Sequence, residues 1–109
     1  MKKGYKCILA VVNNGFSEEA MDAARAAGAK GGTILHGRGT MSKEAEKFFN
    51  ITIQPEKEIV MILAKTDEIE PILKALYTAI GTSTDAQGIA FALPVDEVVG
   101  LESKTPEKQ

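Results

Sequence analysis

The chain has 109 residues, of which 44% are hydrophobic and 26% are charged. This length supports one domain with a single core, which excludes large multidomain mechanisms. Thirteen Lys and Arg against fifteen Asp and Glu give a net charge of −2, the wrong sign for a protein that binds nucleic acid through its phosphates. The single cysteine, Cys7, and the single histidine, His36, exclude an internal disulfide and a Cys/His zinc site.

The two ends of the chain bound the domain. The basic N-terminus, MKKGYK, precedes an apolar run of residues 7–12 that is too short for a secretory signal or a membrane span. We therefore expect a cytoplasmic protein. Residues 1–101 are expected to form the domain, and the polar segment 102–109 is expected to fray because it has too few apolar residues to offset its ordering entropy.

The first half of the chain predicts a strand, a helix and a strand. Residues 5–13 are apolar almost without interruption and end at Asn14 and Gly15, which indicates a buried strand followed by a turn. Ser17 is a candidate N-cap for a helix whose apolar positions recur at helical spacing as far as Gly28. Residues 33–36 predict a short strand between two glycine clusters.

The second half predicts a strand, a helix and a strand. Residues 58–65 are a third apolar run, and apolar residues at i, i+3, i+4 and i+7 over residues 69–80 predict the clearest helix. Gly81 is expected to end that helix as its C′ residue. Residues 89–93 predict a fourth strand that stops at Pro94, and residues 98–101 a short edge strand.

This order of elements predicts an α+β protein, a ferredoxin-like βαββαβ sandwich with an antiparallel sheet and two helices on one face. Residues 5–12 and 59–64 are apolar at odd and even positions alike, so the face opposite the helices should also be apolar. No further segment of the chain is predicted to cover that face. We therefore expect a closed homo-oligomer.

Two glycine-containing segments are candidate ligand sites. The run GGTILHGRGT, residues 31–40, combines glycines that let backbone N–H groups approach an anion with the charged fork of Arg38. It matches neither a Walker loop nor the Rossmann fingerprint, and the alternative is that its glycines only turn the chain. The polar loop of residues 81–88 could hydrogen-bond the phosphates or base of a ligand, although an ordinary connector would have a similar composition.

The insert of residues 40–57 is too long and too charged for a hairpin turn. Met41, Ala45, Phe48 and Phe49 could line one face of a helical turn or two, and two adjacent phenylalanines are hard to leave in water without a use. We interpret the insert as functional, a tolerated surface insertion being the alternative. No catalytic residue or metal site is predicted, because His36 has no nucleophile or carboxylate at a suitable spacing.

Three segments, AGAKGGTILHGRGT, EIVMILAKTDEIEPILKAL and GIAFALPVDEVVG, resemble the PII-type signalling proteins. This nitrogen-regulatory superfamily consists of small cytoplasmic trimers with a ferredoxin-like subunit, and the resemblance spans residues 5–101. It implies a non-enzymatic allosteric regulator, a homotrimer with an adenine-nucleotide cleft between each pair of subunits. It also implies a mobile loop after the second strand that contacts a target protein, such as a membrane transporter or a metabolic enzyme.

By position, the resemblance implies nucleotide contacts from the second strand and from the loop before the last strand. The implied residues are Thr33, Gly37, Arg38, Gly39, Thr82, Ser83, Thr84, Gly88 and Ile89. The implied target-contacting loop spans residues 40–57. Its candidate contact residues are Thr40, Ser42, Lys43, Glu44, Lys47, Phe48 and Phe49.

The chain departs from the family pattern at cationic positions. Ile89 stands where typical members have a phosphate-binding lysine, and Thr40, Gly100 and Glu102 stand where they have arginines. Arg38 is a neighbouring cation that could compensate. The reduced positive charge favours AMP or ADP over ATP as the effector, or another small anion, or no nucleotide. The loop also lacks the tyrosine that some members modify, so regulation by that modification is not expected.

Two other functions remain open on the residues alone. An amino-acid-binding regulatory module of the same topology would favour a dimer and would not need the Gly37-Arg38-Gly39 segment. A small dimeric α+β barrel enzyme would use His36 as its base and would lose activity in the variant His36→Ala. The mass in solution separates a trimer from both.

Overall fold

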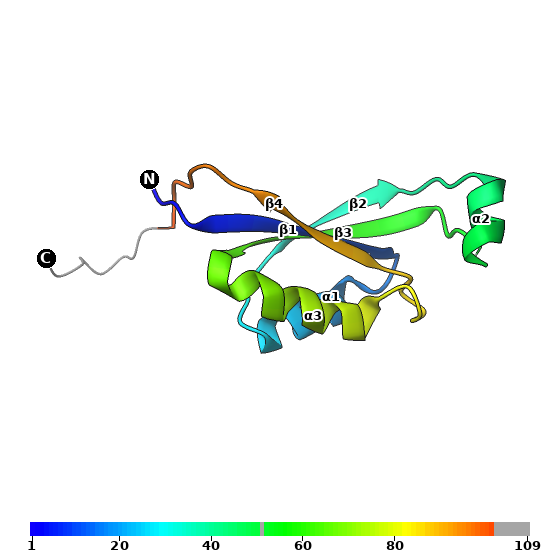
Figure 1. Ribbon diagram of the computed structural model, residues 1–109, viewed down its shortest axis with the longest axis horizontal. Helices are drawn as coiled ribbons and strands as arrows, with labels where there is room; N and C mark the ends of the chain where they lie inside the picture. Colours follow the sequence, from blue (N-terminus) through cyan, green and yellow to red (C-terminus); the bar gives the residue numbers. More distant parts are fainter. Residues whose placement is uncertain (51, 102–109) are drawn as a thin grey trace, which may run out of the picture.

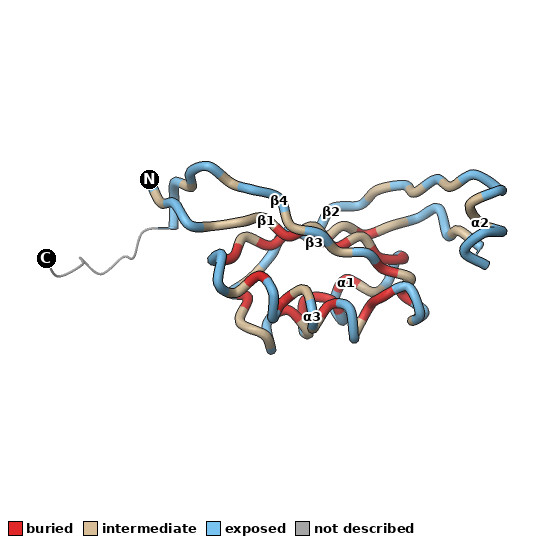
Figure 2. Tube along the Cα trace, viewed as in Figure 1, coloured by how far each residue is buried: buried red, intermediate tan, exposed pale blue. Residues whose placement is uncertain are grey.

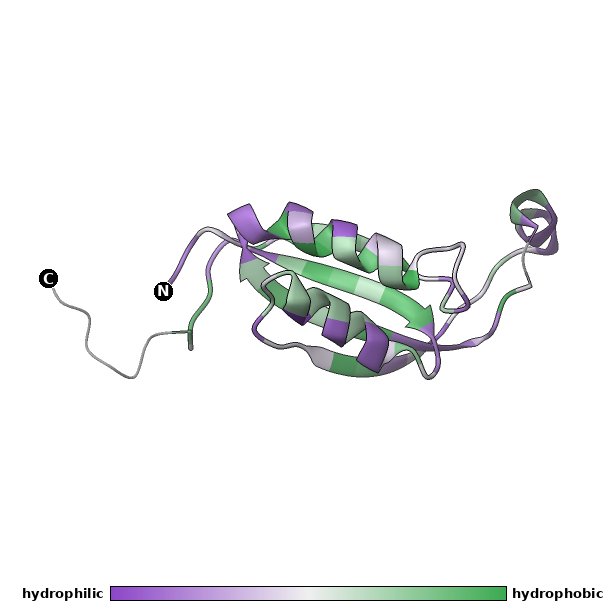
Figure 3. Cartoon of the chain, turned by 90° about the horizontal axis from the view of Figure 1, so that it is seen from below, coloured by the Kyte–Doolittle hydropathy of each residue, from purple (hydrophilic) through white to green (hydrophobic). Residues whose placement is uncertain are grey.

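The computed structural model describes residues 1–50 and 52–101. One antiparallel sheet has the strand order β2-β3-β1-β4. Its strands are β1 (Tyr5–Asn13), β2 (Thr33–Arg38), β3 (Glu56–Lys65) and β4 (Ile89–Pro94). Helices α1 (Ser17–Ala26) and α3 (Ile69–Ile80) lie side by side on one face (Figures 1 and 3), and a short 3-10 helix, η1 (Thr66–Glu68), precedes α3. The ferredoxin-like α+β sandwich is confirmed.

The core lies between the sheet and these two helices. Ile8 on β1 and Ile62 on β3 are fully buried, as are Ile72 and Leu76 on α3. Figure 2 shows the buried residues gathered in the sheet and the two helices. Alternate residues of each strand face the helices, and the residues of α3 spaced at i, i+3 and i+4 face the sheet. Their apolar side chains therefore pack in one layer.

The opposite face of the sheet, here called the open face, is also apolar. The register places Leu9 between Met61 on β3 and Phe91 on β4, and these two side chains are 36% and 41% exposed. Figure 1 shows both sheet-packed helices on the other side, and in the part of the chain that the structure describes no element covers the open face. Its apolar residues are Tyr5, Cys7, Leu9, Val11, Leu35, Ile59, Met61, Leu63, Ile89, Phe91 and Leu93. The expected apolar face is therefore present.

The start of helix α1 differs from the prediction. Ser17 is the first helical residue, the N-cap position belongs to Phe16, and no side chain of the cap residue bonds the first turn. The carboxylate of Glu58 on β3 takes that role, because its Oε1 accepts hydrogen bonds from Gly15 N at 2.7 Å and Ser17 N at 3.2 Å. The expected Ser17 cap was wrong, since a residue far along the chain supplies the acceptor.

The end of helix α3 and the segment after β4 also differ from the prediction. Gly81 follows α3 with an extended backbone, φ −63° and ψ 178°, so it does not form a left-handed C′ cap. It is glycine because a Cβ there would lie 2.5 Å from Tyr77 O. The expected edge strand over residues 98–101 reduces to one bridge between Lys2 and Val98. The segment 102–109 lies outside the described residues.

Residues 39–55 leave the body of the domain and carry a further helix, α2 (Lys43–Phe49), at their far end (Figure 1); we call this segment the arm. Ser42 Oγ accepts a hydrogen bond from Ala45 N at 3.1 Å, and Asn50 ends the helix in a left-handed conformation. Glu46 Oε2 accepts from Ile53 N at 2.8 Å and ties the helix to the returning segment. The arm therefore carries a capped helix of seven residues, which agrees with the helical turn or two that was expected. Residue 51 is not among the described residues.

None of the described helices has the length and apolarity needed to cross a bilayer.

Candidate functional site

The predicted nucleotide-contacting residues lie in two groups on opposite edges of the sheet. Thr33, Gly37 and Arg38 belong to β2, which is one edge strand, whereas Ile89 begins β4, which is the other. Strands β3 and β1 lie between them. Within one chain the two groups therefore do not form a single site.

The amide of Gly39 is not available to a ligand. Gly39 N donates a hydrogen bond to Pro55 O at 2.7 Å, so this amide points towards the β3 side of the sheet and not towards the free edge. Because inward and outward amides alternate along an edge strand, the neighbouring amide of Arg38 faces the outer edge. The Arg38 side chain is exposed. An anion at this edge would therefore meet Arg38 rather than the glycine amide.

The two glycines on either side of Arg38 are closely approached by side chains of β3. A Cβ at Gly37 would lie 3.1 Å from Ile59 Cδ1, and a Cβ at Gly39 would lie 2.8 Å from Lys57 Cε. The stem of Lys57 thus lies against the bare α-carbon of Gly39. At both positions the space beside the glycine is therefore occupied by a side chain of β3 rather than open to a phosphate.

The loop of residues 82–88 is closed by its own backbone. Thr84 Oγ1 donates to Gly81 O at 2.7 Å, and Gln87 N donates to Thr84 O at 3.0 Å. Gly88 N donates to Ile80 O at 2.6 Å, and a Cβ at Gly88 would lie 2.3 Å from that same oxygen. Only glycine fits there. Thr82 and Ser83 stay exposed at the tip of the loop.

A small cavity of about 250 Å³ lies where this loop meets the β4 edge. Three of the predicted residues line it, but its lining contains no lysine or arginine, and no acidic residue. Such a surface suits the apolar face of a ring better than a phosphate group. The lining residues are Leu73, Tyr77, Ile80, Gly81, Thr82, Gly88, Ile89 and Ala90.

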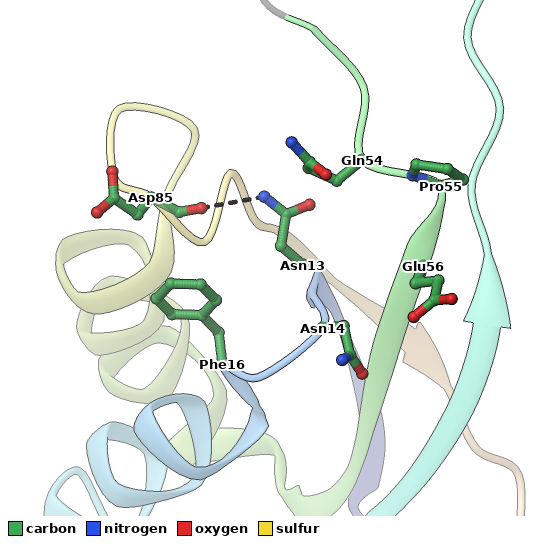
Figure 4. A pocket seen from close by; sticks show the side chains of 7 residues that line it. All are labelled: Asn13, Asn14, Phe16, Gln54, Pro55, Glu56 and Asp85. Carbon is green, nitrogen blue, oxygen red and sulfur yellow. Dashed lines mark hydrogen bonds between the residues drawn. The ribbon is translucent and has the colours of Figure 1, made fainter.

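A larger cavity of about 540 Å³ lies at the end of the sheet (Figure 4). It is bordered by the turn after β1, by the base of the arm and by Asp85 of the 82–88 loop. None of its lining residues is a lysine or an arginine. They are Asn13, Asn14, Phe16, Gln54, Pro55, Glu56 and Asp85. Two carboxylates among them disfavour a multiply charged anion.

Asn13 links the three segments around this cavity. Its side chain is only 7% exposed. Asn13 Nδ2 donates to Asp85 O at 3.0 Å (Figure 4), and its backbone N donates to Ala86 O at 2.9 Å. Its Oδ1 accepts from Lys57 Nζ at 2.7 Å. Sequence reasoning missed this residue, because Asn-Asn-Gly after a strand indicates only a turn.

Burial and hydrogen bonding together shift the pKa values of Lys57 and Glu58. Burial lowers the pKa of Lys57, whose ammonium makes no ion pair with any described residue. Burial raises the pKa of Glu58, but the Gly15 and Ser17 amides, the Ser17 hydroxyl and the charge of His36 outweigh it, so the pKa is lowered overall. Glu58 is thus held as a structural carboxylate. Among the described residues no group of acidic, histidine or cysteine side chains could hold a metal.

Except for Thr40, which lies at the base of the arm, the predicted target-contacting residues gather on helix α2 and its N-cap at the far end. Phe48 and Phe49 are 82% and 61% exposed, and their rings meet edge to face with centroids 5.0 Å apart. The remaining residues of that set are also exposed, and Ser42 has the additional role of capping α2. The structure therefore keeps them together and well away from the 82–88 loop (Figure 1).

Comparison with known proteins identifies the family. The model of the family described as "Nitrogen regulatory protein P-II" matches residues 5–105. The crystal structure of Arabidopsis thaliana PII bound to citrate is similar, with a TM-score of 0.67 and 21% identity, over 92% of this chain and 82% of that chain. Comparison with curated proteins gives no match. Because the family model spans nearly the whole domain, the chain belongs to the nitrogen regulatory P-II family, whose members are signalling regulators and not enzymes.

Proposed function

We propose that this P-II family protein is a homotrimer that binds an adenine nucleotide, or another small anionic effector, in the seams between its subunits. The effector sets the conformation of the arm, and the arm binds or releases a partner protein, a transporter or a metabolic enzyme. The observation that carries the proposal is the division of the candidate nucleotide residues between opposite edges of the sheet. Only a neighbouring copy can supply the missing half of each site.

The open face supports the oligomer. Leu35, Phe91 and Leu93 are each more than two-fifths exposed, on one surface with the half-buried residues of β1. An apolar surface that is continuous across a sheet is rarely left in water and marks an interface. Burying it against copies of the same chain in a closed ring is the usual solution.

The seams would form where the edge strands of neighbours meet. If β2 of one subunit lies beside β4 of the next, with Arg38 at the end where β4 begins, Arg38 approaches Thr82 and Ile89. The Arg38 guanidinium would then neutralise a phosphate, and the apolar cavity beside β4 would receive the base. Each seam would thus have one cation from the predicted set.

The charges favour a less charged nucleotide. Arg38 is the only cation among the nine predicted nucleotide residues, and carboxylates of Glu56 and Asp85 line the nearby larger cavity. Every added phosphate would need a further cation that these residues do not provide. We therefore expect AMP and ADP to bind more tightly than ATP.

The arm provides the surface for the partner. Aromatic side chains, phenylalanine included, are enriched in the cores of protein interfaces. Phe48 and Phe49 are presented together by a helix that is capped at both ends. An apolar groove on the partner would receive this pair.

Calorimetric titration with AMP, ADP and ATP tests the nucleotide part. Arg38→Gln should weaken AMP and ADP binding about tenfold, because it removes a charge-assisted contact. Arg25→Gln is the matched control, since Arg25 lies on α1 and pairs with Asp22 at 3.5 Å. Absence of heat with all three nucleotides, or equal loss of affinity in both variants, would contradict the proposal.

A further inference from the structure

The side chain of Asn13 holds two functional segments at the same time. Its Nδ2 donates to Asp85 O in the 82–88 loop at 3.0 Å, and its Oδ1 accepts from Lys57 Nζ near the start of β3 at 2.7 Å. A carboxamide has its donor and its acceptor on one rigid plane. Turning or displacing the Asn13 side chain therefore weakens both contacts together.

Lys57 belongs to the base of the arm. It is paired with Gly37 in the sheet, and its stem lies against Gly39, where a Cβ would be 2.8 Å from Lys57 Cε. Gly39 N in turn donates to Pro55 O at 2.7 Å, which closes the two segments of the arm. The position of the Lys57 ammonium is therefore tied to the place where the arm leaves the sheet.

Asp85 belongs to a loop that is fixed to the body. Besides the Asn13 side chain, the loop is held by Asn13 N to Ala86 O at 2.9 Å and by Gly88 N to Ile80 O at 2.6 Å. A ligand that contacts the exposed tip, Thr82 and Ser83, can shift Asp85 within these limits. Because Asp85 O accepts the hydrogen bond of Asn13 Nδ2, such a shift displaces the Asn13 carboxamide.

We propose that Asn13 is the coupling residue through which the 82–88 loop and the base of the arm sense one another. This inference rests on the proposed function, because it assigns the residue that carries the signal from the nucleotide seam to the arm. When the loop moves, the Asn13 carboxamide turns and Lys57 loses the one hydrogen-bond partner that the described residues give its ammonium. The Lys57 side chain then leaves Gly39, and the arm changes direction.

The larger cavity is open to both the 82–88 loop and the base of the arm, the two segments that Asn13 joins. Asp85 lines it from the loop, Gln54 and Pro55 line it from the arm, and Asn13 lies between them (Figure 4). A group that enters the cavity therefore contacts the loop and the arm together. Such a site biases both segments at once, which is what coupling requires.

Amide hydrogen exchange on the nucleotide-free full-length chain tests the coupling without a ligand. Lys57→Met removes the ammonium but keeps the stem and leaves the Asn13–Asp85 contact in place. It should speed exchange about fivefold at Gly39 and also at the amides of the 82–88 loop. Faster exchange confined to the arm base would overturn the inference. Lys65→Met, at the exposed far end of β3, is the matched control and should change neither segment.

Asn13→Asp separates the two contacts. Its carboxylate can still accept from Lys57, more strongly than the carboxamide, but it cannot donate to Asp85 O. Exchange should become slower at the arm base and faster in the 82–88 loop. Opposite responses of this kind are not expected from a general loss of stability, which would speed exchange everywhere.

The same variant tests the response to AMP and ADP. Saturating nucleotide should change exchange at Gly39 in the unmodified protein, and this response should fall at least about fivefold in Asn13→Asp although heat of binding is still seen. An undiminished response would overturn the inference. If the unmodified protein binds neither nucleotide, the nucleotide part of the proposed function fails, while the nucleotide-free exchange pattern still decides whether Asn13 couples the segments.

Discussion

Glu58 caps helix α1 from strand β3, with its Oε1 accepting the amide of Ser17 at 3.2 Å. The same oxygen accepts the amide of Gly15 at 2.7 Å, so one carboxylate fixes the turn between β1 and α1. This turn borders Asn13 and the larger cavity. A buried charge that serves as a helix cap therefore also fixes one wall of the candidate site.

Replacing Glu58 should reveal this role. Glu58→Gln removes the negative charge that the two amides stabilise, and we expect the free energy of unfolding at pH 7 to fall by about 1.5–3 kcal/mol. Urea unfolding of both proteins measures this difference in the free energy of unfolding. Glu18→Gln is the control, because Glu18 is exposed in the same helix and should change the value by less than about 0.5 kcal/mol.

The stabilisation from Glu58 should depend on pH. Because the pKa of Glu58 in the folded chain lies below its ordinary value of 4.5, the carboxylate contributes fully above pH 4.5. That contribution is lost as the pH falls through the folded-state pKa. The stability gap between the unmodified protein and Glu58→Gln should thus be constant near neutrality and shrink in acid. A gap that widened in acid would contradict the assignment.

Gly88 should not tolerate a side chain. A Cβ there would lie 2.3 Å from Ile80 O and 3.0 Å from Val12 Cγ1, so Gly88→Ala should lower the free energy of unfolding by about 1–3 kcal/mol. Thermal or urea unfolding provides the measurement. Gly31→Ala is the matched variant, since a Cβ at Gly31 meets no atom within 4 Å. Equal stability of the two variants would show that the close approach at Gly88 is not present.

The open face should decide the oligomeric state. Phe91 pairs with Leu9 in the middle of that face, so Phe91→Glu would place a charge inside the proposed subunit interface. We expect light scattering to give the mass of a single 11.7 kDa chain for this variant. Ala26→Glu, on the exposed side of α1, should leave the mass of the unmodified protein unchanged. Loss of assembly in the control variant alone would contradict the location of the interface.

Phe48 and Phe49 should matter for partner binding and not for stability. Both rings are exposed at the end of the arm, so replacing both with serine should change the free energy of unfolding by less than about 0.5 kcal/mol. A photoreactive side chain at position 48 should crosslink to a partner, and one at Thr78 on α3 should not. A large loss of stability in the double variant would show that the pair packs against the domain instead.

The sequence predicted the sheet and its two helices because their signals are local and repeat along the chain. The continuous apolar run of β1 and the i, i+3, i+4 pattern of α3 each lie within one element, so they can be recognised without knowing the tertiary structure. The cap of α1 could not be predicted, because Glu58 is 41 residues from Ser17 along the chain. Gly81 ends α3 as expected, but its extended backbone could not be predicted, because its close approach to Tyr77 O depends on the direction in which the chain leaves the helix.

The candidate site was predicted only in outline. The residues around Gly37 and Gly88 were singled out by their composition, but composition does not show that the amides of Gly39 and Gly88 are already hydrogen-bonded. Asn13 and Lys57 carried no signal, since their contact depends on the pairing register of β1 and β3. The pairing register of the strands, and not the residue types, brings Asn13 and Lys57 together.

Native mass spectrometry with ADP tests the central claim most directly, because it reports assembly and occupancy in one spectrum. Three chains of 11.7 kDa should give a species of about 35 kDa that takes up as many as three ADP molecules, one for each seam. A monomer, or a trimer that stays free of nucleotide at millimolar ADP, would contradict the account.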